Sequence, residues 1–92
     1  MTAHLRKLKY RAWHRGFREA DLILGPFADR HLGELVASEL VDFERLLEAP
    51  DHDLYAWITG QAEPPPAMDL PVLAKIRAFR LVAREARPDL GA

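Results

Sequence analysis

The sequence contains no cysteine among its 92 residues, so it forms neither a disulfide framework nor a thiolate metal site. This composition fits a reducing compartment. The apolar runs are short and interrupted by charged residues, and none is long enough to cross a bilayer. The basic opening lacks the apolar core of a secretory signal, and the residues of functional interest begin near Tyr10, which leaves no room for a removable leader. We therefore expect a cytoplasmic protein of bacterial type, without membrane insertion.

Catalytic and cofactor-binding patterns are also missing. There is no nucleophile elbow, P-loop or dinucleotide glycine fingerprint. The four histidines match no established spacing of metal ligands (His4, His14, His31 and His52). The segment that begins at Asp51 resembles the start of a calcium loop, but Ala56 and Ala62 stand where such a loop needs glycine and glutamate. The sequence therefore predicts a protein that is not an enzyme and that holds no metal.

Charge is distributed unevenly along a chain whose net charge is only −1. Six bases and no acid occur up to Arg18, whereas ten acids and two bases occur from Glu19 to Asp53. A basic first segment followed by acidic ones indicates an electrostatically polarised binding surface. Nucleic acid is a poor partner for it, because the acidic segments would repel phosphates.

Apolar residues recur at helical spacing, and no segment alternates with the period of a strand. We therefore predict an all-α fold of four to five short helices around one core, in a single domain over residues 1–92 with its core at about 5–83. The first helix is amphipathic with a cationic outer face and ends before Gly16, since a glycine there can adopt the left-handed conformation. The second begins at Phe17 or Arg18, and Gly25-Pro26 is expected to kink or break it.

Polar residues and prolines predict the remaining boundaries. Ser38 is a reasonable N-cap for a third helix that ends at Glu48, and Asp51 is a candidate N-cap for a fourth helix that Gly60 closes. Residues 61–68 form a proline-rich, extended connector. Asp69 then caps the last helix, which Pro88 limits.

The segment from Arg15 to Glu19 has two compatible interpretations. In the structural one, Gly16 caps the first helix, Arg15 lies at its C-terminal end and Glu19 favours the start of the next helix. In the functional one, a tight glycine turn exposes Arg15 at the tip of the molecule, and Glu19 folds back to orient it.

This segment resembles the RGxxE signature of the SdhE family of FAD assembly (flavinylation) factors for succinate dehydrogenase. Arg15, Gly16 and Glu19 match the signature and Asp21 follows it. Blocks at residues 22–28, 43–48 and 51–60 support the resemblance, which covers roughly residues 5–80. It implies a five-helix bundle that acts as an assembly chaperone: it binds the flavoprotein subunit of succinate dehydrogenase and promotes covalent attachment of FAD to it.

The resemblance also implies which residues bind the partner. Arg15 and Gly16 would contact its flavin-binding region, Glu19 would support the turn or contact the partner, and Asp21 would assist. Charge suggests that Arg11 enlarges this surface. His14 stands where many relatives carry arginine, so contact there would be weaker or pH-sensitive.

Other functions remain open from the sequence. A generic protein-interaction adaptor, or an antitoxin-like regulator, would need no flavin role. Fumarate reductase is a further candidate partner. We expect no tight binding of FAD by this chain, because no phosphate cradle is present, and we expect a monomer.

Overall fold

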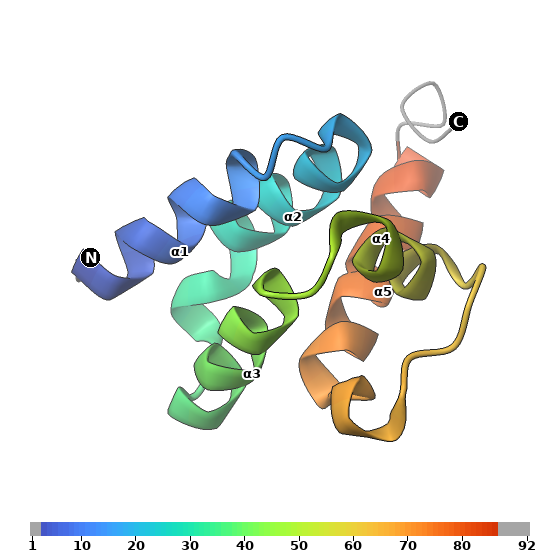
Figure 1. The fold of residues 1–92 in the computed structure, drawn as a ribbon. Coiled ribbons are helices and arrows are strands. Elements are labelled where there is room, and N and C mark those ends of the chain that lie inside the picture. The colour runs from blue at the N-terminus through green and yellow to red at the C-terminus, as the bar shows by residue number, and fades with distance from the viewer. Residues whose placement is uncertain (1–2, 87–92) are drawn as a thin grey trace.

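A computed structural model describes residues 3–86 of the chain, with side chains as far as residue 82. The described part is a bundle of five α-helices without a strand (Figure 1). Their bounds are α1 Ala3–Trp13, α2 Arg18–His31, α3 Ala37–Leu47, α4 Asp51–Thr59 and α5 Pro71–Ala86; single 3-10 turns occur at Leu32–Glu34 and Pro66–Met68. The predicted all-α five-helix bundle is confirmed.

Helices α1 and α2 pack side by side as a hairpin (Figure 1). Leu8 and Ala12 of α1 are buried against the core, as the amphipathic pattern predicted. Four residues, 14–17, connect the helices, and we refer to them as the glycine turn. Gly16 has a φ of 87°, which a residue with a Cβ adopts only with strain. Gly16 has the predicted left-handed conformation, but α1 already ends at Trp13 and not directly before the glycine; α2 begins at Arg18, one of the two predicted positions.

Helix α2 continues through Pro26, so of the predicted kink or break at Gly25-Pro26 the break is wrong. Proline removes one backbone donor, but the helix is held by buried residues on both sides of it (Ala20, Leu24, Phe27 and Ala28). Tertiary packing of an apolar face supplies most of the stability of a helix in a protein, and here it outweighs the local preference.

The predicted helix caps are only partly correct. Helix α3 begins at Ala37 after Val36, and the side chain of Glu39 accepts the Val36 N–H at 3.1 Å, so Ser38 is not the N-cap. Asp51 is the first residue of α4 and not its cap, because Pro50 occupies that place. Gly60 does close α4, with a φ of 81°.

Helix α5 packs against α2, α3 and α4 and closes the core. It starts at Pro71 and Asp69 is not its cap; the connector is not extended throughout, because residues 66–68 form a 3-10 turn. Pro88 lies outside the described residues. Each of the five helices contributes to the buried core, for example Leu8, Phe27, Phe43, Trp57 and Ile76.

Candidate functional site

His14 and Gly16 of the glycine turn are exposed, at one end of the α1–α2 hairpin. A Cβ placed on Gly16 would meet nothing within 4 Å, so the position demands a left-handed backbone but leaves open space around it. The turn is held from within by Asp21, whose Oδ1 accepts the Arg15 N–H at 3.1 Å. A rigid, sterically open turn of this kind can contact another molecule closely.

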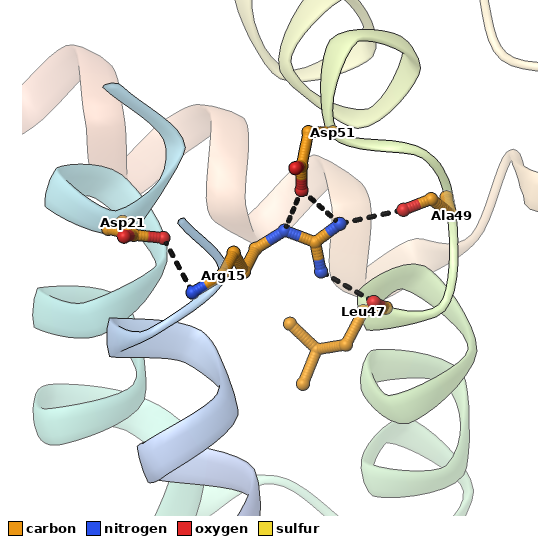
Figure 2. A network of polar contacts seen from close by, with 5 residues as sticks. All are labelled: Arg15, Asp21, Leu47, Ala49 and Asp51. Atoms are coloured by element: carbon orange, nitrogen blue, oxygen red, sulfur yellow. Dashed lines mark hydrogen bonds and ion pairs between the residues drawn. The ribbon is translucent and has the colours of Figure 1, made fainter. Parts of the chain in front are cut away.

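The side chain of Arg15 points inward from the turn, with 8% of its surface exposed (Figure 2). Its Nε and Nη2 each lie 2.8 Å from Oδ1 of Asp51. Nη2 also donates to the Ala49 carbonyl at 2.7 Å, and Nη1 donates to the Leu47 carbonyl. The prediction that Arg15 is exposed at the tip is therefore wrong.

Unsatisfied backbone groups explain this orientation. Leu47 is the last residue of α3, and carbonyls at the end of a helix have no partner within it. A guanidinium presents its N–H donors in a planar array, so one side chain satisfies the Leu47 carbonyl, reaches the Ala49 carbonyl just past the helix, and pairs with Asp51 in the first turn of α4. Arg15 thereby links the glycine turn to the segment between α3 and α4.

Glu19 does not fold back onto Arg15. It is exposed, and among the described residues its side chain takes part in no hydrogen bond or ion pair. The predicted support of the turn from inside is supplied by Asp21 instead. The Glu19 carboxylate remains accessible to a partner.

Arg11 lies in α1 and His14 is the first residue of the glycine turn, and their surroundings differ. Arg11 Nη1 is 3.4 Å from Oε2 of Glu44, which leaves 39% of its side chain exposed. His14 is exposed, its Nδ1–H donates to the Tyr10 carbonyl at 2.8 Å, and its ring stacks on that of Tyr10 with centroids 4.1 Å apart. The structure thus brings Arg15, Gly16 and Asp21 together, with His14 beside them and Arg11 turned toward α3.

Three residues of α4 belong to this site although the sequence analysis did not place them there. Asp51 pairs with Arg15, while the ring of Phe17 meets those of His52 and Tyr55 at centroid distances of 4.9 and 5.4 Å. Their one sequence signal was the 51–60 block, which accompanies the glycine turn in the resemblance. The ion pair and the ring contacts join the two segments into one surface.

Acids of other helices neutralise half of the basic first segment. Lys9 Nζ lies 3.9 Å from Oδ1 of Asp29, and Arg11 and Arg15 have the acidic partners described above. A continuous cationic stripe for nucleic acid is therefore not present on α1. Among the described residues, no group of three or more histidines and acids is arranged to hold a metal ion, and no helix is long and apolar enough to span a membrane.

Comparison with known proteins identifies the family. A sequence model described as "Flavinator of succinate dehydrogenase" matches residues 6–80, which include the whole glycine turn and α4. The chain belongs to this family. Its members are assembly factors and not enzymes.

Curated relatives of this chain come from bacteria and from mitochondria. The chain is 37% identical over 76 residues to the "FAD assembly factor SdhE" of Acetobacter pasteurianus, covering 83% of this chain and 70% of the relative. It is 39% identical over 72 residues to the mitochondrial "Succinate dehydrogenase assembly factor 2" of Dictyostelium discoideum, and 35% identical over 83 residues to that of Scheffersomyces stipitis. These matches cover 78% and 90% of this chain but 51% and 54% of the relatives, so the chain spans about half of their length. No solved structure matches it.

Proposed function

We propose that this chain binds the flavoprotein subunit of succinate dehydrogenase and promotes the covalent attachment of FAD to it. The observation that carries the proposal is the family match over residues 6–80, together with relatives named as FAD and succinate dehydrogenase assembly factors. The glycine turn supports it, because it offers a partner a sterically open contact centred on Gly16. Glu19 and His14 flank that contact with accessible polar groups.

The chain would act by positioning and not by supplying a reacting group. FAD and the residue that takes it belong to the partner, which performs the bond formation. Holding two reacting groups in a productive arrangement can lower a barrier by several kcal/mol, roughly 7–11 in favourable cases, without a catalytic side chain. In this proposal the glycine turn, Asp21 and the α4 residues beside it hold the partner in the conformation in which flavin and attachment site meet.

Several finer points belong to the proposal. We infer that the chain binds no free FAD tightly, works as a monomer in the cytoplasm and accepts fumarate reductase as a further partner. The generic adaptor and the antitoxin-like regulator are the competing functions, and both predict that flavin attachment is independent of this chain.

The test compares the succinate dehydrogenase flavoprotein subunit expressed with and without this chain. The samples are denatured and separated on a gel, and covalent flavin is measured as fluorescence in the subunit band. We expect fluorescence to rise when the chain is present. Equal fluorescence in both samples, with the chain folded and abundant, would favour the adaptor.

A further inference from the structure

We propose that Arg15 is a positioning residue, which acts on the partner through Asp51 and the segment between α3 and α4. This inference rests on the proposed function and deepens it. It concerns how the partner surface is built, and it assigns Asp51 to that surface as the acceptor that holds Arg15.

Contacts within the chain occupy most of the guanidinium of Arg15. Arginine has five N–H donors; in Arg15 three of them make hydrogen bonds, to Asp51, Leu47 and Ala49, and Nη2 also lies within ion-pair distance of Asp51. With 8% of the side chain exposed, little of the charge is accessible to a second protein. A direct ion pair with the partner would require these internal bonds to break, which leaves two carbonyls and a carboxylate without their donor.

The bonds of Arg15 also join the glycine turn and the start of α4 into one surface. Outside Arg15 lie Gly16, Arg18 and Glu19, which are all exposed. On the other side of the ion pair lies His52, also exposed and in edge contact with the ring of Phe17. Because Arg15 bonds to the segment between these groups, it fixes the glycine turn relative to α4. The partner would meet both segments at once as a single surface.

The arrangement of acceptors around residue 15 suits arginine and not lysine. Two carbonyls and one carboxylate surround the guanidinium in different directions (Figure 2). The N–H donors of a lysine ammonium all start from a single nitrogen atom, so lysine cannot reach all three acceptors. Lysine would therefore preserve the charge of residue 15 and lose the link.

The experiment is a double-mutant cycle on the affinity of the full chain for the flavoprotein subunit, with the variants Arg15→Ala, Asp51→Ala and both together. We expect Asp51→Ala to weaken binding about tenfold in the wild-type chain and by less than about twofold once Arg15 is absent. Equal effects of Asp51→Ala in both backgrounds would overturn the proposal. Arg15→Lys should bind as weakly as Arg15→Ala, and recovery of affinity with lysine would mean that the charge itself touches the partner.

Arg77→Gln is the matched control for a general loss of stability. Arg77 is a half-buried arginine whose Nε donates to the Trp57 carbonyl at 2.8 Å, away from the glycine turn. We expect this variant to lower the melting temperature and to leave the affinity unchanged. If it weakened binding as much as Arg15→Ala, the Arg15 effect would be one of stability alone and the proposal would fail.

Amide exchange in the free chain tests the link without a partner, so its failure is distinguishable from failure of the proposed function. The Arg15 N–H donates to Asp21 and should be protected. We expect Asp51→Asn to accelerate its exchange relative to the amides of α5, and this milder variant also serves if Asp51→Ala does not fold. Unchanged protection in Asp51→Asn would show that Asp51 does not hold the turn.

Discussion

At the scale of single residues, the contact of Trp13 with Gly25 sets the distance between α1 and α2. A Cβ on Gly25 would lie 2.2 Å from Cδ2 of Trp13, well inside any tolerated contact. The indole also donates its Nε1–H to Oδ2 of Asp29 at 3.2 Å. A methyl group at position 25 would therefore displace the ring and break this hydrogen bond.

We expect Gly25→Ala to lower the free energy of unfolding by about 1–3 kcal/mol through overpacking. Urea denaturation followed by circular dichroism measures this change. Gly33→Ala is the control, since a Cβ there meets nothing within 4 Å, and it should stay within about 0.5 kcal/mol of the wild type. Equal stabilities of the two variants would show that Trp13 does not need Gly25.

Arg15 shows what sequence reasoning cannot reach at this scale. The turn itself was predictable, because a glycine between two amphipathic segments is a local signal. The direction of the Arg15 side chain was not, since its acceptors lie 32, 34 and 36 residues away. Two of these acceptors are backbone carbonyls. Every residue has one, so the residue types at positions 47 and 49 do not indicate the contact. Glu19 was assigned the support that Asp21 supplies, because both acids fit the first turn of α2.

At the scale of elements, apolar spacing predicted the helices. The residues at which they begin and end depend on single hydrogen bonds and on burial, which apolar spacing does not predict. Helix α3 starts one residue before Ser38, because Glu39 reaches back to the Val36 N–H. Such a backward bond competes with the local capping tendency of serine. Pro26 lies within α2 for a related reason: burial on both sides outweighs the local rule.

Glu39 also joins α3 to α5, and this contact predicts a pH dependence. Its carboxylate lies 2.6 Å from Nζ of Lys75, and hydrogen bonds from Lys75 and then from the Val36 N–H lower the pKa of Glu39 below its ordinary value of 4.5. A lowered pKa in the folded state stabilises the fold above the unfolded-state pKa, and this contribution is lost as the pH falls through the folded-state value.

We therefore expect Glu39→Gln to reduce the free energy of unfolding at neutral pH and to converge with the wild type in acid, below the lowered pKa. Denaturation at a series of pH values measures the difference. Glu48→Gln is the control, at an exposed position in the C-cap of α3. We expect its free energy of unfolding to equal that of the wild type at neutral pH, so no difference disappears in acid. A Glu39→Gln effect of constant size down to acid pH would contradict the ion-pair explanation.

At the scale of the whole molecule, half of the bases in the first segment form ion pairs with acids from later in the chain. Lys9, Arg11 and Arg15 pair with acids of α2, α3 and α4, respectively. Composition and spacing were sufficient for the fold class, because an all-α bundle follows from helical periodicity alone. Composition and spacing predicted a larger free cationic surface than the structure has, since ion pairs between helices depend on how the helices pack. Arg6, Lys7 and Arg18, the other three bases of the first segment, are exposed.

The most direct test of this account substitutes the two left-handed glycines and measures covalent flavin on the partner subunit. Gly16 and Gly60 have φ values of 87° and 81°, and a Cβ at either meets nothing within 4 Å. Arginine at either position thus carries the same backbone cost, roughly 1–2 kcal/mol. We predict that flavin fluorescence of the subunit stays at the wild-type level with Gly60→Arg and falls toward the level without the chain with Gly16→Arg. Equal fluorescence with the two folded variants would contradict the claim that the glycine turn binds the partner.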